Sequence, residues 1–139
     1  MTPASRDDWF DIHTLFVRYA TALDACDVEA IIDCFTPDGT LDSPAVGKFA
    51  GHAGIRAFAE RTLKFKAEGV QYRHVLSNLR AEVDGDRGHA KCYLLAFLTR
   101  DGKTEQLSPG EYDCDVVRTD GVWRFRRRDL AMDQVAGKP

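Results

Sequence analysis

The sequence predicts an α+β fold, in which three helices from the N-terminal half pack on the concave side of a cone-shaped barrel formed by a strongly bent antiparallel or mixed sheet. Two observations support this class. Up to about residue 65, apolar residues recur every three or four positions, which is the period of a helix that faces a core. From about residue 70 to residue 132, they alternate in short runs separated by Asp-Gly pairs, which is typical of an antiparallel meander. Helices followed by a meander indicate helices packed on one face of a sheet.

The first helix is predicted from its N-terminal cap. Ser5-Arg6-Asp7-Asp8 has the spacing of a capping box, with a hydroxyl at the cap and a carboxylate three residues later. A helix should therefore begin after Ser5 and run to about Leu23. Its apolar residues fall on one stripe that should face the core: Trp9, Ile12, Phe16, Tyr19 and Leu23.

A second, shorter helix is predicted after Asp27, which has the character of an N-cap residue. Its apolar side consists of Val28, Ile31, Ile32 and Phe35. Pro37-Asp38-Gly39 should end this helix, which then forms a hairpin with the first. The extended piece Thr40-Leu41-Asp42-Ser43, followed by Pro44 and Gly47, indicates an edge strand and a loop, because proline cannot donate to a central ladder.

A third helix and four long strands are predicted for the remainder of the chain. Helical spacing returns after Gly51, and Gly69 is placed to terminate the helix. Its apolar side consists of Ile55, Phe58, Ala59, Thr62, Leu63 and Phe65. Three later segments are expected to be hairpin turns, because Asp-Gly tolerates the positive φ that tight turns need: 84–86, 101–102 and 120–121. These turns divide the segment from about Val70 to Met132 into four strands.

The length and composition favour a single domain. A chain of 139 residues has room for one hydrophobic core, so we expect one domain over residues 1–139. Apolar residues make up 44% and charged residues 29%, which places the chain among ordinary soluble proteins. The net charge of -3 supplies no field that would attract a polyanion, so nucleic acid and anionic membrane surfaces are not expected partners.

Motifs for cofactors, metals and membranes are missing from the sequence. The four cysteines have no CxxC spacing, so we expect reduced, buried thiols rather than a zinc or redox site. The remaining histidines, His13, His52 and His89, show no metal-ligand spacing, and no glycine-rich phosphate loop occurs. No apolar stretch approaches the roughly 18 residues of a membrane span. We therefore expect a cytoplasmic protein without a metal or cofactor.

The order of elements, with several local sequence stretches, resembles the SnoaL-like, nuclear-transport-factor-2-like superfamily over nearly the whole chain. The stretches are Arg18-Tyr19-Ala20 with Leu23-Asp24, Cys34-Phe35-Thr36-Pro37-Asp38-Gly39, Gly51-His52 before Ile55, Arg73-His74 with Ser77-Asn78, and Asp120-Gly121-Val122-Trp123-Arg124-Phe125. The resemblance implies a mostly apolar pocket enclosed by the sheet and the helices. Members include dehydratases, dehydrochlorinases, ketosteroid isomerases, polyketide cyclases, epoxide hydrolases and proteins that only bind, so the fold alone does not choose a reaction.

His74 is the first candidate for chemistry. Alternation along the strand would place His74, Leu76 and Asn78 on one face, towards the pocket. An imidazole can take a proton near neutral pH when a carboxylate fixes its tautomer and stabilises the imidazolium. The placement of Asp24 relative to His74 resembles the Asp-His dyad of scytalone dehydratase, bile-acid 7-alpha-dehydratase and hexachlorocyclohexane dehydrochlorinase. The resemblance therefore implies that Asp24 orients His74.

Tyr19 and Arg128 complete the catalytic set that the resemblance implies. Tyr19 lies five residues before Asp24, as does the tyrosine that polarises or protonates the substrate oxygen in the bile-acid dehydratase group. Residues five apart on a helix point about 140° apart, so both reach one cavity only where the helix ends at its rim. Arg128 resembles the arginine that those enzymes use for an anionic or departing group, although Arg126 and Arg127 leave the register open.

Further residues are expected to bind the substrate. The apolar wall is predicted to include Trp9, Phe16, Phe58 and Leu76. Asn78 is a candidate anchor for a ligand oxygen, and Tyr112 is a candidate for the opposite wall. Relatives often carry an aspartate where this chain has Cys114, and its loss counts against an epoxide hydrolase, which needs several cooperating carboxylates.

Each of these residues also has a structural interpretation. A histidine at the start of a strand is often only a hydrogen-bonded structural residue, Asp24 could cap the following turn, and Tyr19 could be a core tyrosine. The arginine-rich run from Arg124 to Arg128 could be a solvated strand face. The resemblance to the family favours the functional interpretation of His74, Asp24, Tyr19 and Arg128 over the structural one.

The preferred hypothesis is a cofactor-independent lyase, foremost a dehydratase, or an isomerase that uses an Asp-His dyad. The alternative is a non-catalytic ligand-binding or assembly module, and the small subunit of an aromatic-ring dioxygenase ranks last. The apolar side chains suit a steroid, terpenoid, polyketide or aromatic substrate equally well. We expect a homodimer or homotrimer, because a long meander beside a small helical layer leaves one face of the sheet uncovered.

Overall fold

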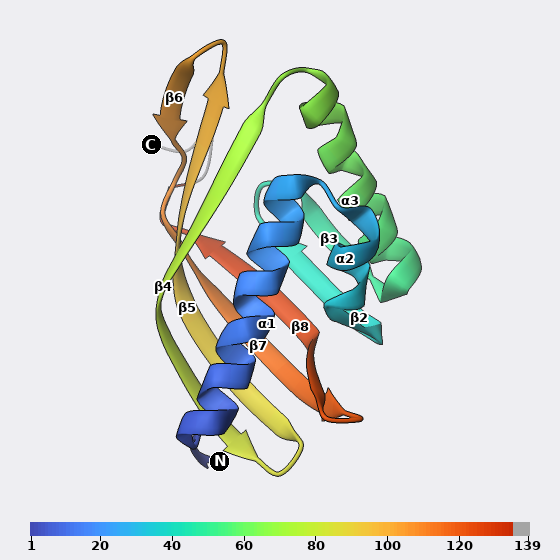
Figure 1. Cartoon of the computed structure of the whole chain (residues 1–139), viewed down its shortest axis with the longest axis vertical. Coiled ribbons are helices and arrows are strands. Elements are labelled where there is room, and N and C mark those ends of the chain that lie inside the picture. The colour runs from blue at the N-terminus through green and yellow to red at the C-terminus, as the bar shows by residue number, and fades with distance from the viewer. Residues whose placement is uncertain (135–139) are drawn as a thin grey trace.

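The computed structural model describes residues 1–134, and this part of the chain contains three helices and eight strands. The helices are α1 (Arg6–Ala25), α2 (Val28–Asp33) and α3 (Gly51–Ala67). The strands are β1 (Thr2–Pro3), β2 (Phe35–Ser43), β3 (Gly47–Ala50), β4 (Gln71–Asp84), β5 (Arg87–Arg100), β6 (Lys103–Gln106), β7 (Gly110–Thr119) and β8 (Val122–Met132). Figure 1 shows a curled sheet with the helices gathered on one side. The predicted α+β class is confirmed, and the sheet is curled without closing.

The sheet is mixed, with the strand order β1-β4-β5-β7-β8-β2-β3, and β6 pairs with β5 beside this path. The four long strands β4, β5, β7 and β8 are the predicted meander, and they pair antiparallel. The parallel contact is between β2 and β8. In Figure 1, α1 crosses the sheet in front of β7 and β8, while α3 lies beside β2 and β3. Residues from the helices and from the curled sheet line a cavity between them.

The predicted caps form. The Ser5 hydroxyl accepts a hydrogen bond from the Asp8 amide at 3.1 Å, and the Asp27 carboxylate accepts one from the Ala30 amide at 3.2 Å. Each bond satisfies one of the free amides of a helix N-terminus. Between the two helices, Cys26 ends α1 in the left-handed conformation, with φ 56°. This residue reverses the chain so that α2 can pack beside α1.

The expected end of the second helix is wrong. The helix ends at Asp33, and Phe35 already belongs to β2, where it pairs with Phe125 of β8. Pro37-Asp38-Gly39 therefore lies in a strand, within a register shift between Phe35 and Thr40 that accommodates a residue without an amide hydrogen. A side chain at Gly39 would approach the Phe125 carbonyl to 3.0 Å, so this close strand contact favours glycine.

Two short strands, β1 and β3, were not predicted, and the third predicted long strand is divided into β6 and β7, which both pair with β5. The segment after Pro44 was expected to be a loop, yet Gly47–Ala50 pairs with β2. β6 follows the turn at Asp101-Gly102, where both residues have positive φ, as the two-residue turn type with left-handed centres requires. A strand of two to four residues is too short for its sequence to show a clear alternation of apolar and polar residues. Such strands form mainly because an adjacent strand offers hydrogen-bond partners.

The core lies between α1 and the inner face of the sheet. The buried rings of Phe16 and Tyr19 of α1 pack edge-on against Phe125 of β8, and Ile12 and Trp123 are buried in the same core. No helix within residues 1–134 is both long enough and apolar enough to span a membrane.

The assignment of Trp9 to the core stripe is wrong. Its side chain is 37% exposed, stacks on His13 and donates its indole N–H to the Leu79 carbonyl at 3.1 Å. The first turn of α1 therefore lies at the edge of the sheet, where a large ring remains partly in solvent.

Candidate active site

A cavity of about 230 Å³ lies between the helices and the inner face of the sheet. Most of its wall is apolar, with side chains from α1, α3, β2, β5 and β8. The apolar lining includes Leu23, Leu41, Phe58, Phe65, Leu94, Leu107 and Leu130. The polar side chains in this wall include the catalytic residues predicted from the sequence: Tyr19, Asp24, His74 and Arg128. The fold therefore brings these four residues, which span more than 100 positions, to one apolar space.

Asp24 and His74 form a two-point contact in the cavity wall. Asp24 Oδ1 lies 2.5 Å from His74 Nδ1, and Asp24 Oδ2 accepts the His74 backbone N–H at 3.0 Å. The two side chains are only 14% and 15% exposed. A carboxylate can only accept, so the contact places a hydrogen on Nδ1, and in the neutral form of the ring Nε2 carries the lone pair. In that form His74 can take up a proton at Nε2.

The position of Asp24 runs against ordinary helix electrostatics. It lies in the last turn of α1, which contains no basic residue, although a negative charge is unfavourable near the C-terminus of a helix. The turn is held close to β4, since Gln71 donates its side-chain amide to the Asp24 carbonyl at 3.0 Å. The contact with His74 offsets this electrostatic cost. Asp24 is therefore explained by its contact with His74, whereas Ser5 and Asp27 are explained by helix capping.

Tyr19 lies in the same cavity wall as Asp24. The expected difficulty, that residues five apart point in different directions, is resolved because α1 ends at Ala25 and the cavity wraps around its last turns. Burial raises the pKa of Tyr19 above its ordinary value of 10.0. The phenol therefore stays protonated at neutral pH and can act as a hydrogen-bond donor or an acid.

Arg128 is the inward member of the three consecutive arginines. The β7–β8 pairing shifts between Asp115 and Val116, which leaves Arg126 without a cross-strand partner as a bulge residue. The bulge changes the alternation, so that Phe125 and Arg128 both point inward. Arg128 is 1% exposed and lies in the cavity wall. Its guanidinium centre is 4.1 Å from the ring centre of Tyr19 and 3.6 Å from that of Tyr112.

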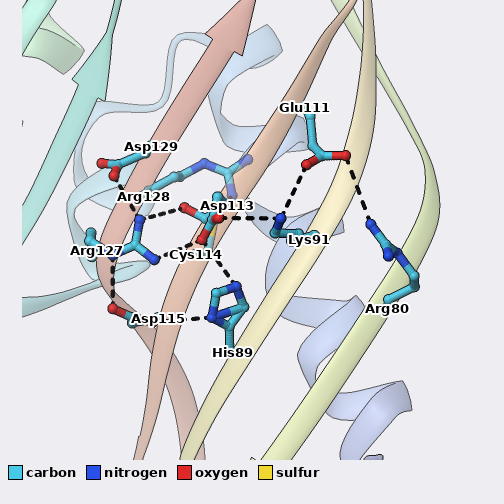
Figure 2. A network of polar contacts seen from close by, with 10 residues as sticks. All are labelled: Arg80, His89, Lys91, Glu111, Asp113, Cys114, Asp115, Arg127, Arg128 and Asp129. Carbon is cyan, nitrogen blue, oxygen red and sulfur yellow. Dashed lines mark hydrogen bonds and ion pairs between the residues drawn. The ribbon is translucent and has the colours of Figure 1, made fainter.

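Arg127 points to the opposite face of the sheet and is held by three carboxylates. Figure 2 shows it among Asp113, Asp115 and Asp129, with contacts of 2.7, 2.8 and 2.7 Å. These contacts raise the pKa of Arg127, chiefly through the hydrogen bond that it donates to Asp115. Arg126 is exposed and lies 3.9 Å from Asp38. Among the three arginines, therefore, Arg128 is the one in the cavity wall.

The residues predicted to bind the substrate divide into two groups. Phe58 and Tyr112 lie in the cavity wall. The other four line a separate groove of about 300 Å³ between α1 and β4: Trp9, Phe16, Leu76 and Asn78. The groove and the cavity share two residues, Asp24 and His74, so the dyad forms the wall between them.

The predicted alternation of β4 fails at Asn78. Ser77 pairs with Tyr93 and Arg80 pairs with Lys91, so Asn78 and Leu79 together oppose a single residue of β5. This is a β-bulge, and Asn78 has the left-handed φ of 58° that asparagine tolerates. The bulge moves Asn78 off the face that His74 shares with Leu76, and Leu79 takes its place.

Several cavity residues were not predicted from the sequence. Leu94 and Ala96 face inward from β5. Tyr72 lies two residues before His74 in β4 and also lines the cavity. Their position follows from the alternation of β4 and β5, because every second residue of a strand points to the same face of the sheet. The alternation shows which residues share a face, but not which face lines the cavity. Among residues 1–134, no group of three His, Cys, Asp or Glu side chains is placed to hold a metal ion.

Comparison with known proteins identifies a family model and several similar proteins. A family model described as SnoaL-like domain matches residues 5–129. The uncharacterised protein Rv2910c of Mycobacterium tuberculosis is 29% identical over 131 residues, which cover 92% of this chain and 87% of Rv2910c. A single-substitution variant of Rv3472 from Mycobacterium tuberculosis, a protein of unknown function, matches with a TM-score of 0.83 and 28% identity, over 95% of this chain and 75% of that chain.

A structure named for a reaction also matches. A candidate scytalone dehydratase from Novosphingobium aromaticivorans has a TM-score of 0.81 and 19% identity, over 95% of each chain. At this identity the likeness shows a shared fold.

Proposed function

Because the chain belongs to the SnoaL-like domain family, we propose that it is a cofactor-independent lyase, most simply a dehydratase, acting on a small carbocyclic molecule. The family includes dehydratases and polyketide cyclases. The observation that carries the proposal is the Asp24–His74 contact of 2.5 Å in the wall of an apolar cavity. A histidine held in this way has the tautomer and the surroundings that a general base needs.

The proposed reaction begins with proton transfer from carbon. His74 Nε2 takes a proton from the carbon beside a substrate carbonyl, and the released electron pair forms a carbon–carbon double bond. The adjacent carbon–oxygen bond breaks at the same time or later, and hydroxide leaves. Asp24 stabilises the imidazolium that forms, since a carboxylate beside Nδ1 favours the charged ring.

Tyr19 is proposed to supply the proton that converts hydroxide into water. The neutral phenol lies beside Arg128, whose positive charge favours a phenolate after the proton has left. The proton on His74 then returns to Tyr19, directly or through the product water, and the site is ready for another cycle. The substrate loses one hydrogen and one hydroxyl group, which together make water. The reaction therefore needs no oxidant or reductant.

Dehydration of a bicyclic β-hydroxy ketone tests this proposal. We would incubate the protein with 3-hydroxy-1-tetralone, whose loss of water gives fluorescent 1-naphthol, and compare the wild-type chain with His74→Gln. His89→Gln is the matched control, because His89 lies on the outer face, 3.1 Å from Asp113. We expect acceleration by the wild type and His89→Gln, and background rates with His74→Gln. Equal rates for all three proteins would contradict the proposal.

A second candidate function is assembly, and it is supported by the outer face of the sheet. Val75, Tyr93 and Leu95 lie on the paired strands β4 and β5 and are 47%, 48% and 37% exposed. We propose that a second copy of the chain covers these side chains in a homo-oligomer. Light scattering should give a multiple of 15.6 kDa, and Tyr93→Glu should lower the mass to that of a monomer. Leu63→Glu, at an exposed position of α3, should leave the mass unchanged.

A further inference from the structure

Gln71 joins the end of α1 to the start of β4 through its side-chain amide. Its Nε2 donates to the Asp24 carbonyl at 3.0 Å and to the Tyr72 carbonyl at 2.8 Å. A side-chain amide nitrogen carries two hydrogens, so it can serve both acceptors at once. Because the two carbonyls belong to different elements, Gln71 links the backbone of the helix to the backbone of the strand.

The Asp24 carbonyl is one of the last carbonyls of α1, which have no partner inside a helix. The carbonyl before it, that of Leu23, accepts the Cys26 amide at 3.1 Å in the turn that follows the helix. The Asp24 carbonyl accepts instead from Gln71, a residue 47 positions away. The last turn of α1 contains no basic residue. Gln71 therefore supplies the donor at a helix end where positive charge is favourable.

The backbone of Gln71 is fixed on both sides. The preceding residue, Val70, is buried and donates its amide to the Phe65 carbonyl at 3.0 Å, and Gln71 itself pairs with Thr99 of β5. The side chain of Gln71 is exposed. Gln71 thus reaches Asp24 from a fixed point, and its substitution removes nothing from the core.

Other contacts between α1 and β4 cannot replace this link. Trp9 donates to the Leu79 carbonyl, but it lies in the first turn of α1, 15 positions before Asp24. At 1.5 Å per residue this separation is about 22 Å of helix. Within residues 1–134, the hydrogen bonds between the last turn of α1 and β4 are those of Asp24 with His74 and the one from Gln71.

The Asp24–His74 contact requires an accurately placed backbone. The Asp24 carboxylate reaches both ring Nδ1 and the backbone nitrogen of His74, at 2.5 and 3.0 Å, and an aspartate side chain is too short to adapt to a displaced helix end. We propose that Gln71 is a positioning residue, which fixes the backbone of Asp24 to β4 and so keeps its carboxylate on the His74 ring.

Gln71 lies outside the cavity wall, so it acts through Asp24 and not on a ligand. Its effect on the geometry of the dyad is independent of any reaction, whereas its effect on turnover rests on the proposed function. The two effects are therefore measured separately.

Proton NMR measures the geometry. A hydrogen held between imidazole Nδ1 and a carboxylate gives a signal far downfield, and its absence in His74→Gln would assign it to this contact. We expect the signal to move upfield or to broaden by exchange in Gln71→Leu and Gln71→Glu, because neither side chain can donate at neutral pH. Gln106→Leu, the matched control at an exposed position of β6 outside the cavity wall, should leave the signal unchanged.

Gln71→Lys separates positioning from a merely structural role. An ammonium group can donate to both carbonyls, and its charge is favourable at the end of a helix. Glutamate has nearly the shape of glutamine, but it places a negative charge beside the same two carbonyls. We therefore expect Gln71→Lys to restore the downfield signal that Gln71→Glu loses, although lysine resembles glutamine less in shape.

Turnover of 3-hydroxy-1-tetralone measures the consequence for catalysis. One neutral hydrogen bond changes an equilibrium by about threefold to tenfold, so Gln71→Leu should lower kcat by about this factor. KM should stay within about twofold, because the cavity wall is unchanged. Gln71→Glu should lose more than Gln71→Leu, and Gln71→Lys should keep most of the wild-type rate.

The outcomes separate this inference from the proposed function. A downfield signal that responds to Gln71 in a protein without turnover would support the positioning role and count against the lyase. An unchanged signal in Gln71→Leu and Gln71→Glu would overturn the inference. The same conclusion would follow if Gln71→Lys lost the signal as completely as Gln71→Glu, or if Gln106→Leu lost it too.

Discussion

Asp24 holds His74 at two points, with one carboxylate oxygen 2.5 Å from ring Nδ1 and the other 3.0 Å from the backbone nitrogen of the same residue. The backbone contact fixes the carboxylate relative to β4, and the ring contact fixes the tautomer. A single aspartate thus couples the end of α1 to the start of β4. The dyad is a structural link and a candidate catalytic pair at once.

Asp24→Asn should separate these two roles. The asparagine oxygen can still accept the His74 backbone N–H, so we expect the fold to persist, but an amide cannot stabilise the imidazolium. Turnover of 3-hydroxy-1-tetralone should fall by on the order of a hundredfold to ten-thousandfold. Asp24→Ala should in addition lower the free energy of unfolding by about 1 to 3 kcal/mol, because the buried amide loses its acceptor. Undiminished turnover in Asp24→Asn would argue against an orienting carboxylate.

Tyr19→Phe should reduce turnover and leave ligand binding intact. Loss of a general acid costs on the order of a hundredfold, while the phenyl ring keeps the contact with Arg128. Tyr112→Phe is the matched control, since Tyr112 also lies in the cavity wall against Arg128. The kcat and KM for 3-hydroxy-1-tetralone should be measured for both variants. If Tyr112→Phe proves the more damaging of the two, the proton donor has been misassigned.

Arg128→Met should make the folded state more stable. Methionine fills a similar volume without a buried charge, and the lost cation–π contacts offset only part of the gain. We expect the free energy of unfolding in urea to rise by on the order of 1 kcal/mol. Arg127→Met should have the opposite effect, because Asp113, Asp115 and Asp129 would lose the cation between them. A destabilised Arg128→Met would mean that the guanidinium is well compensated in the free protein.

Buried phenols and thiols should make the protein sensitive to alkaline pH. The pKa of Tyr19 and of Tyr112 is raised by burial, and burial raises the pKa of Cys92 to about 11 and that of Cys114 to about 12. The unfolded chain releases these protons near the ordinary values of 9.0 for thiols and 10.0 for phenols. The folded state holds them longer, so their contribution to stability is intact below about pH 9 and is lost as pH rises through the folded-state values.

Urea unfolding from pH 7 to pH 11, with tyrosinate absorbance as a second signal, measures this dependence. Stability should decline above about pH 9, and part of the tyrosinate signal should appear only as the chain unfolds. Tyr112→Phe should flatten the decline. A constant free energy of unfolding between pH 8 and pH 11 would contradict the burial of these groups.

Local signals in the sequence were sufficient for the helices and the meander. Ser5 and Asp27 satisfy free amides of the residues that follow them, and the Asp-Gly turns need only their own φ angles, so neighbouring residues determine both features. The helix after Asp27 ended early because Phe35 pairs with Phe125, a partner 90 positions away. Such pairings depend on the assembled sheet and leave no local period.

The candidate site was predictable in part for the same reason. The resemblance to a family pointed to Tyr19, Asp24, His74 and Arg128, but no spacing in the chain would have brought them together. The inward turn of Arg128 depends on the bulge at Arg126, and the displacement of Asn78 depends on a second bulge in β4. A bulge changes which residues face inward, and it is defined by the partner strand rather than by the bulged sequence.

Deuterium incorporation into 1-tetralone in heavy water, followed by mass spectrometry with the wild type, His74→Gln and His89→Gln, tests most directly whether His74 is the base. This measurement reports proton removal from carbon by itself, before any group leaves. We expect incorporation above background at the carbon beside the carbonyl with the wild type and His89→Gln, and none with His74→Gln. Incorporation that is unaffected by His74→Gln would contradict the claim that His74 is the base.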